Sequence, residues 1–219
     1  MPLPIIDYFA NGPQTINTNF KEDFSKGRLD WIPADPHTIK DYYELAELAI
    51  SSRESVGRFV GEALNSSGLM QWLGAMPSQI PKALQAYQHK NKQIATVLID
   101  NDINQIGAVL SLGQKLYRGG GITSGVQGNV LSTTFCPEVA INEAFYRGKA
   151  QKFGKIQIYV LEAVDPKTCV YVYKQTGTVL GHEREVLFAS GAVVTINEIK
   201  KSGLHECGLP YEIISATIS

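Results

Sequence analysis

The feature that most constrains the fold is a change of hydrophobic period near Gln114. Before this point, apolar residues recur at spacings of three and four, which is typical of amphipathic helices. After it, glycines become frequent and short β-branched runs lie between turn residues, which is typical of strands. Because helices come first and strands second, without βαβ alternation, the pattern predicts an α+β fold.

The chain is expected to form one domain with an irregular N-terminal arm. Residues 1–36 are rich in Pro, Asn, Gly and Asp and show no sustained period. With 219 residues and 44% apolar content, the chain can bury one substantial core. We therefore expect a single domain over 37–219, helical over about 37–112 and β-rich over about 113–219.

The periodicity also locates the individual elements. Helices are expected from about His37, after Ser52, from near Pro81, over 94–110 as one helix or a broken pair, and from Pro137. Strands are expected at Lys115–Arg118, Asn129–Thr134, Lys155–Ala163, Cys169–Tyr173, Arg184–Phe188, Val193–Ile199 and Tyr211–Thr217.

Charge and apolar patterning exclude several classes of partner. Twenty basic residues against twenty-one acidic ones give a net charge of -1, and no Lys/Arg block is present, so no nucleic-acid partner is expected. No apolar run approaches membrane-spanning length, and the start lacks the basic region of a secretory signal. We expect a soluble chain with no membrane partner. Three widely spaced cysteines argue against a disulfide framework and suit a reducing compartment.

Two phosphate-binding motifs fail in the glycine-rich segment Arg118–Gly125. Val126 and Gln127 stand where a P-loop needs its lysine and hydroxyl. The dinucleotide fingerprint fails because Ser124 replaces its third glycine and no βαβ unit surrounds the segment. A P-loop and a Rossmann domain are therefore both rejected.

Metal and nucleophile chemistry have little support. His205 and Cys207 could bind a metal, but no CxxC or HExxH motif accompanies them, and two ligands rarely form a zinc site. We therefore expect no metal. No GxSxG elbow is present. Cys136 offers a thiol in principle, although such a cysteine is more often a small buried hydrophobe.

Three short segments in the β-rich half remain: Leu116–Gly120, Leu131–Phe135 and Glu183–Phe188. Each alone is compatible with an ordinary surface cation, an edge strand or a solvated strand face. Together they resemble the arginine-specific mono-ADP-ribosyltransferases, a family of bacterial toxins and effectors defined by an Arg, a Ser-Thr-Ser-like strand and a Glu-x-Glu pair. The resemblance covers roughly the last hundred residues.

The resemblance is most specific at the Glu-x-Glu pair, because the family continues this pair into an apolar strand. Residues 135–145 also look like the helix that follows the family's Ser-Thr-Ser strand. Thr134 replaces the last Ser of that motif and still offers a hydroxyl. The helical first half matches no motif of the family, which leaves the choice of target protein open.

The resemblance implies N-terminal helices packed on an ADP-ribosyltransferase-like two-sheet β core, with NAD⁺ bound as substrate in a central cleft. The implied reaction moves ADP-ribose from NAD⁺ to an arginine of a target protein and releases nicotinamide. The implied setting is a toxin or effector, secreted by a route that needs no signal peptide and acting in the cytoplasm of a target cell. We expect a monomer.

The carboxylates carry the chemistry in this interpretation. In a strand, Glu183 and Glu185 would point to one face while Arg184 points away. Glu185 would stabilise the positive charge that develops on the ribose when the nicotinamide bond breaks. Glu183 would orient the acceptor guanidinium and take its proton, because a charged guanidinium is a poor nucleophile.

Other residues would hold the dinucleotide. Arg118 offers a planar fork of donors suited to the pyrophosphate. Ser132 would hydrogen-bond Glu185 and fix its rotamer, and Thr133 would support the strand. By resemblance, the main chain at Gly119 would bind the nicotinamide amide.

Two further positions are assigned by resemblance to the region after the Ser-Thr-Ser strand. Phe145 or Tyr146 would supply an aromatic stack and Arg147 a second phosphate contact, although core packing explains Phe145 equally well. Tyr173 is a candidate exposed aromatic for recognition of the target, with an edge-strand tyrosine as the alternative.

Three alternatives remain. The chain could be a plain NAD⁺ glycohydrolase, could modify a nucleic-acid base, or could be a catalytically silent module of the same fold that binds a partner. The Glu-x-Glu pair favours arginine, and the near-neutral charge argues against nucleic acid. A silent module would be expected to lack part of the Arg118, Ser132 and Glu185 set, which is complete here.

Overall fold

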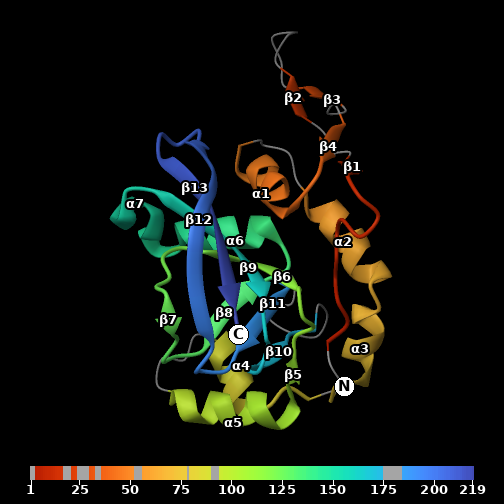
Figure 1. Ribbon diagram of the computed structural model, residues 1–219, viewed down its shortest axis with the longest axis vertical. Coiled ribbons are helices and arrows are strands. Elements are labelled where there is room, and N and C mark those ends of the chain that lie inside the picture. Colours follow the sequence, from red (N-terminus) through yellow and green to blue (C-terminus); the bar gives the residue numbers. More distant parts are fainter. Residues whose placement is uncertain are drawn as a thin grey trace.

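The computed structural model describes residues 3–16, 36–51, 56–77, 79–89, 94–174 and 184–219, and the backbone alone of 21–23 and 30–32. The α+β class is confirmed: the helical first half packs against a large sheet built from the second half (Figure 1). The helices are α1 (Tyr42–Ser51), α2 (Gly57–Ser66), α3 (Leu69–Ala75), α4 (Lys82–Gln88), α5 (Thr96–Ile106), α6 (Pro137–Phe145), the 3₁₀ turn η1 (Tyr146–Gly148) and α7 (Lys149–Phe153).

The first helix begins later than the sequence predicted. Residues His37–Ile39 form a strand, β4, which pairs antiparallel with β1 (Gln14–Ile16) in the arm. Ile39 is buried in the strand just as it would be on a helix, so its apolar character could not distinguish the two. The pairing with a distant segment overrides the local helical period.

The sheet contains each of the seven predicted strands. Its order is β5 (Ala108–Val109), β10 (Cys169–Val172), β11 (Glu185–Phe188), β8 (Leu131–Thr134), β6 (Lys115–Gly119), β9 (Ile156–Ala163), β13 (Pro210–Ile218), β12 (Val193–Leu204) and β7 (Gly125–Val126). The strands β6 and β8, both fully described, pair through Tyr117 and Thr134 alone. The sheet is therefore divided at this point into a four-stranded and a five-stranded part, which diverge on either side of Arg118.

The described part of the N-terminal arm is attached to the β-rich half. It runs beside α2 and α3 (Figure 1), and its side chains Leu3, Ile6 and Tyr8 are buried. The amide of Gln114 accepts a hydrogen bond from the Ile6 N–H at 2.8 Å and donates one to the Ile6 carbonyl at 3.0 Å. The Tyr8 hydroxyl donates to the Phe135 carbonyl at 2.7 Å, directly after β8. The arm thus supports the strand that carries Ser132. A separate small hairpin pairs β2 (Lys21–Asp23) with β3 (Asp30–Ile32).

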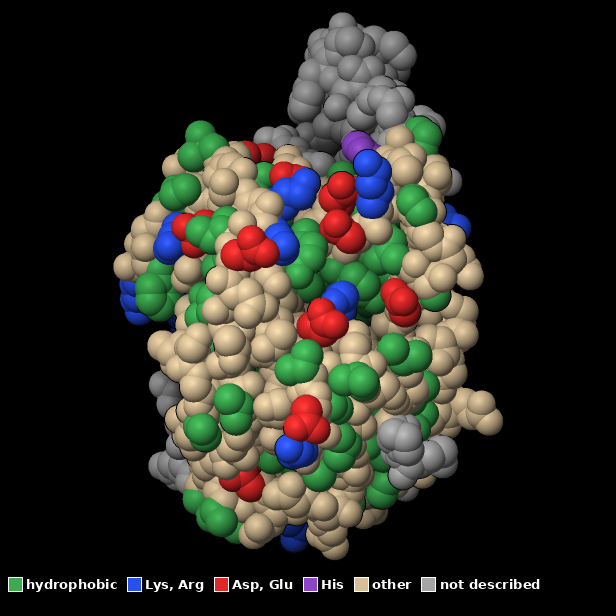
Figure 2. Space-filling view, viewed as in Figure 1, with side chains coloured by type: hydrophobic (Ala, Val, Ile, Leu, Met, Phe, Trp, Pro, Cys, Tyr) green, Lys and Arg blue, Asp and Glu red, His purple; other side chains and the backbone are tan. Residues whose placement is uncertain are grey.

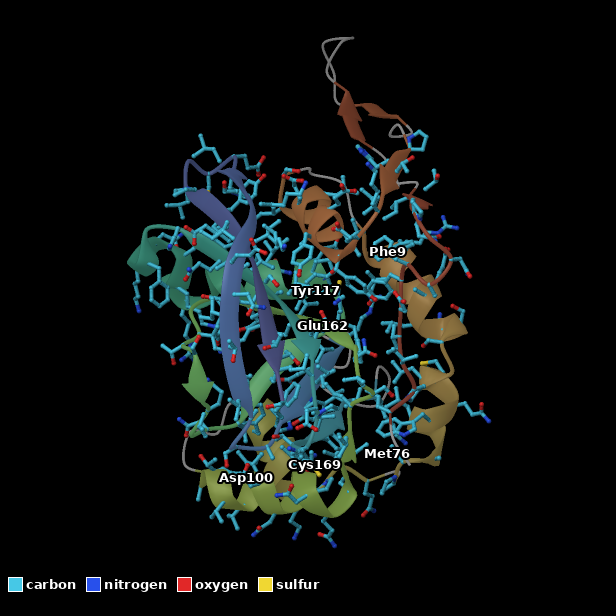
Figure 3. All side chains as sticks on the ribbon, viewed as in Figure 1. Phe9, Met76, Asp100, Tyr117, Glu162 and Cys169 are labelled. Carbon is cyan, nitrogen blue, oxygen red and sulfur yellow. The ribbon has the colours of Figure 1, made fainter. Side chains whose placement is uncertain are left out.

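Two groups of buried side chains fill the space between sheet and helices (Figure 3). The larger joins the arm, α1, α2, α3 and α6 to the sheet, with Tyr117 near its centre. The smaller packs Leu84 of α4 and Ile103 of α5 against Tyr173 and Leu187. The four-stranded part of the sheet contributes to both groups, because Val170, Val186 and Phe188 belong to the larger one.

The surface agrees with the near-neutral charge of the sequence. Acidic and basic side chains are interspersed on the face shown in Figure 2, without a large region of one sign. Among the described residues, no helix has both the length and the apolar character needed to cross a membrane.

Candidate active site

Arg118 lies where the two parts of the sheet separate. Its guanidinium Nη1 donates to the Ser132 carbonyl at 2.6 Å, so the side chain bridges β6 and β8 just past their single paired position. Its Nε is buried and has no hydrogen-bond partner among the described residues. A buried donor without a partner costs free energy. An anionic oxygen of a ligand would satisfy it.

The electrostatic surroundings of Arg118 are mixed. Burial lowers the pKa of Arg118, while the nearby Tyr87, Glu143 and Tyr159 raise it. A guanidinium remains protonated at ordinary pH even after a substantial downward shift. Arg118 therefore supplies a permanent positive charge in a partly dry site.

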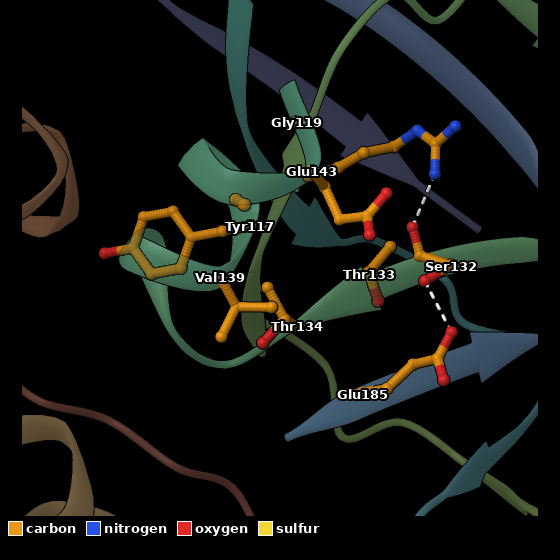
Figure 4. Close-up of a pocket in the computed structure, with 10 residues that line it drawn as sticks. Tyr117, Gly119, Ser132, Thr133, Thr134, Val139, Glu143 and Glu185 are labelled. Atoms are coloured by element: carbon orange, nitrogen blue, oxygen red, sulfur yellow. Dashed lines mark hydrogen bonds between the residues drawn. The ribbon is translucent and has the colours of Figure 1, made fainter. Parts of the chain in front are cut away.

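Glu185 is the first residue of β11 and lies opposite Thr134 of β8. Its side chain is only 6% exposed, and the Ser132 hydroxyl donates to its Oε1 at 2.6 Å (Figure 4). Burial raises the pKa of Tyr173, and the charge of Glu185 adds to this effect. The hydrogen bond expected between Ser132 and Glu185 is thus present, and it fixes a buried carboxylate beside the Arg118 bridge.

Two hollows meet at Arg118. The first is a cavity of about 30 Å³, lined by Arg118, Ser132, Glu185 and residues of α6 that include Glu143. The second is an open groove of about 740 Å³ on the five-stranded part of the sheet. Its lining combines apolar and aromatic side chains with amides and carboxylates: Ile122, Phe153, Tyr159, Ile196, Ile199 and Ile214 with Gln127, Gln157, Asn197, Glu198 and Glu212. Arg118 lines both, so a ligand held by its guanidinium can extend into each.

Glu143 lines the cavity and Lys149 pairs with it, although the sequence pattern did not single out either residue. Glu143 points from α6 toward β8 (Figure 4), and its Oε2 accepts from the Lys149 Nζ at 3.1 Å. The Lys149 chain lies over Gly120, since a Cβ added there would be 3.2 Å from the Lys149 Cδ. The sequence could have indicated Glu143, because it lies three residues after Ala140 and therefore on the α6 face that meets β6.

Phe145 and Arg147 lie elsewhere. The ring of Phe145 packs on the ring of His205, with centroids 5.3 Å apart. Arg147 has a φ of 55°, and its guanidinium lies 5.1 Å from the centroid of the Tyr146 ring. Neither residue lines the cavity or the groove beside Arg118. Their roles in binding a dinucleotide remain predictions from the sequence, without support from this geometry.

Gly119 and Thr133 have clear packing roles. A Cβ added at Gly119 would lie 1.6 Å from the Ala140 carbonyl oxygen, so α6 packs directly on the glycine backbone. The Thr133 hydroxyl donates to the Val186 carbonyl at 2.8 Å and ties β8 to β11. Both residues shape the cavity, whatever further contact they make with a ligand.

The structure corrects two expectations near Glu185. The predicted strand from Arg184 begins one residue later, because Arg184 has a φ of 50° and lies in the left-handed region. A left-handed residue breaks the strand alternation on which a common face for Glu183 and Glu185 depends. Glu183 itself lies outside the described residues. Tyr173 is not an exposed recognition residue: it is 1% exposed, and its hydroxyl donates to the Leu84 carbonyl at 3.1 Å.

The remaining candidate groups lie outside the site. Cys136 is buried, in keeping with its interpretation as a small hydrophobe. The His205 Nδ1 and Cys207 Sγ lie 3.0 Å apart. Among the described residues, no three His, Cys, Asp or Glu side chains converge as a metal site would require.

Comparison with known proteins shows a similarity in fold and none in sequence. No protein-family model matches the chain, and no curated protein sequence matches it. Among solved structures, the ADP-ribosylating toxin BECa of a binary enterotoxin of C. perfringens, determined with NADH, matches with a TM-score of 0.51 and 14% identity. The match covers 95% of this chain and 57% of BECa, so the chain spans little more than half of that toxin's length. The fold of this chain is therefore similar to that of this ADP-ribosylating toxin.

A second solved structure is more distant. Plx2a, an ADP-ribosyltransferase toxin from Paenibacillus larvae, matches with a TM-score of 0.46 and 12% identity, over 74% of this chain and 96% of Plx2a.

Proposed function

We propose that this chain transfers ADP-ribose from NAD⁺ to an arginine side chain of a target protein and releases nicotinamide. The observation that carries the proposal is the buried Glu185 carboxylate, fixed by Ser132 beside Arg118 in the fold of an ADP-ribosylating toxin. A setting as a toxin or effector, acting in the cytoplasm of a target cell, belongs to the same proposal.

NAD⁺ is the proposed substrate of the two hollows that meet at Arg118. The pyrophosphate would lie at Arg118, whose unpartnered Nε and planar fork suit anionic oxygens. The nicotinamide ribose would lie at the cavity that Ser132 and Glu185 line. The adenosine half would extend into the open groove, where Phe153 offers an aromatic face and Gln157 an amide. The BECa structure was determined with NADH, which is consistent with this class of ligand.

The reaction can be derived from the charges. The bond between the ribose C1′ and the nicotinamide nitrogen breaks, its electron pair leaves with nicotinamide, and positive charge develops on the ribose. The Glu185 carboxylate, held in place before the reaction, stabilises this charge where water is largely excluded. A guanidinium nitrogen of the target then forms the new bond to C1′ and gives up a proton. Glu183 is the proposed acceptor of that proton.

The alternatives differ in the step after the nicotinamide bond breaks. In a glycohydrolase, water takes the place of arginine, and the same Glu185 geometry serves. A silent binding module has no need of a buried carboxylate, because burying a charge costs free energy. The burial of Glu185 in the same cavity as the half-buried Arg118 is therefore more characteristic of a reactive site.

The deciding experiment uses labelled NAD⁺ in cell lysates, with mass spectrometry of any labelled protein. Wild type is expected to release nicotinamide and to label arginine. Glu183→Gln is expected to keep nicotinamide release and to lose arginine transfer by about 10²–10⁴-fold, the usual contribution of a general base. Glu62→Gln, on the exposed face of α2, is the control and should match wild type.

Two results would decide against this proposal. Folded wild type that releases no nicotinamide in any lysate would favour the silent module. Nicotinamide release without labelled protein, unchanged in Glu183→Gln, would favour the glycohydrolase.

Lys149 and Arg147 should differ in their effect on NAD⁺ binding. Lys149→Gln removes a cation that lies against Gly120 and Glu143, so we expect the Kd for NAD⁺ to rise about tenfold to a hundredfold, the value of one charge-assisted contact. Arg147→Gln removes a cation stacked on Tyr146 and should leave the Kd unchanged. Isothermal titration of wild type and both variants, with NAD⁺ and with nicotinamide alone, measures these Kd values. A larger loss from Arg147→Gln would instead support a phosphate contact at Arg147.

A further inference from the structure

The residue that precedes Glu185 has an unusual backbone conformation. Arg184 has a φ of 50°, which bulky side chains adopt only when surrounding contacts hold them there. The very next residue is the first of β11 and carries the buried carboxylate. The conformation of Arg184 therefore sets how the chain starts β11 and, with it, the direction of the Glu185 side chain.

The Arg184 side chain reaches from the sheet to helix α2. Its Nη2 donates to the Gly57 carbonyl in the first turn of α2 at 3.2 Å. One helical turn later, Gly61 leaves room for the guanidinium: a Cβ added there would lie 3.1 Å from the same Nη2. The Arg184 carbonyl accepts from the Phe135 N–H at 3.4 Å, at the end of the Ser132 strand. Both the side chain and the main chain of Arg184 are thus held.

The helix that receives Arg184 is itself fixed to the site. The Val56 N–H, at the start of α2, donates to the Glu138 Oε1 of α6 at 2.7 Å. Helix α6 packs on β6 through Gly119 and carries Glu143 into the cavity. The first turn of α2 is therefore connected both to the Arg118 side of the cavity, through α6, and to the Glu185 side, through Arg184.

We infer that Arg184 is a positioning residue: its anchor on α2 holds the left-handed turn that directs the Glu185 carboxylate toward Ser132. This inference rests on the proposed function for its catalytic consequence. It gives the helical first half, which carries no recognisable motif, a defined part in the site. Loss of the anchor should misdirect Glu185 while leaving Arg118 and the groove in place.

Gly61→Ala tests the inference without removing Arg184. The added methyl crowds the guanidinium, whereas alanine has a higher helix propensity than glycine, so α2 itself should not be weakened. The guanidinium must give way by a few tenths of an ångström, so we expect kcat for nicotinamide release to fall about threefold, while KM for NAD⁺ changes by a smaller factor. Gly74→Ala, in α3 with nothing near its added Cβ, is the matched control and should keep the wild-type kcat.

A double-mutant cycle identifies the route of the effect. Arg184→Ala should lower kcat at least as much as Gly61→Ala, and Arg184→Lys should recover part of the loss by keeping a cationic donor. In the Arg184→Ala background, Gly61→Ala should cause no further loss, because the group that it crowds is gone. A wild-type kcat for Arg184→Ala, or additive losses in the double variant, would overturn the inference.

Crystal structures of wild type and Arg184→Ala provide a readout that does not depend on turnover. We expect the Ser132 Oγ to Glu185 Oε1 contact to lengthen beyond hydrogen-bond distance in the variant, because the anchor on the Gly57 carbonyl is lost. An unchanged contact would contradict the positioning role. If wild type released no nicotinamide at all, the proposed function would fail, and this structural comparison would still decide whether Arg184 directs Glu185.

Discussion

Glu185→Gln is expected to lower nicotinamide release about a hundredfold to a thousandfold, with arginine transfer falling in parallel. Losing one group that stabilises charge in a transition state typically costs this much. The replacement is isosteric, and its amide oxygen can still accept the hydrogen bond from Ser132. Removal of a buried charge should leave the free energy of unfolding equal to wild type or higher. The effect is therefore expected in kcat and not in folding.

The measurement compares kcat, KM and thermal unfolding for wild type, Glu185→Gln and the control Glu162→Gln. Glu162 of β9 pairs with Lys115 of β6. The Glu162 carboxylate is half exposed and lines neither the cavity nor the groove. The control should retain wild-type kcat, since exposed ion pairs contribute little to stability. Nicotinamide release from Glu185→Gln within threefold of wild type would remove Glu185 from the reaction.

The site could be predicted from sequence where its chemistry lies on regular strands. Ser132 and Glu185 are found on β8 and β11, and the antiparallel register of these strands brings them together. Short β-branched runs between turn residues indicate these strands clearly. The position of Arg118 also follows from a regular strand, because Arg118 comes directly after Tyr117, the residue of β6 that pairs with β8.

The sequence could not indicate interactions that depend on distant partners. Strand β4 required β1, some 20 residues earlier, to override a helical period. The left-handed Arg184 required a carbonyl of α2, which is far away in the chain. Tyr173 was a candidate exposed aromatic, yet α4 covers it, and the Leu84 carbonyl accepts a hydrogen bond from its hydroxyl. In each case a tertiary contact decided between two locally acceptable conformations.

Arg147 illustrates a different limit. The resemblance assigns it by its distance along the chain from the Ser-Thr-Ser strand, but α6, η1 and α7 occupy that interval here. The turn between α6 and α7 directs Arg147 onto Tyr146 and brings Lys149 to Gly120. Chain distance transfers between proteins only when the intervening elements have the same length, so the pairing of Lys149 with Glu143 of the cavity had to be found in three dimensions.

Gly119→Ala is expected to destabilise the fold by about 3 kcal/mol or more, beyond the usual range for overpacking. The added methyl would overlap the Ala140 carbonyl oxygen at 1.6 Å and would also approach the Ala144 amide nitrogen at 2.7 Å. Both partners are backbone atoms of α6, so no side-chain rotation can relieve the overlap. Helix α6 would have to move away from β6, and the cavity that it forms with Arg118 would change with it.

Urea unfolding without NAD⁺ separates this packing role from contact with the dinucleotide. Gly128→Ala, where an added Cβ meets nothing within 4 Å, is the control and should change stability by less than about 0.5 kcal/mol. If Gly119→Ala unfolds like wild type but no longer binds NAD⁺, the glycine serves the ligand and not the helix. If it is strongly destabilised, Gly119 is required for the close contact that carries Glu143 and Lys149 to Arg118. Binding of the nicotinamide amide by the Gly119 main chain would then depend on the same close packing, because α6 determines how the glycine backbone is presented to the cavity.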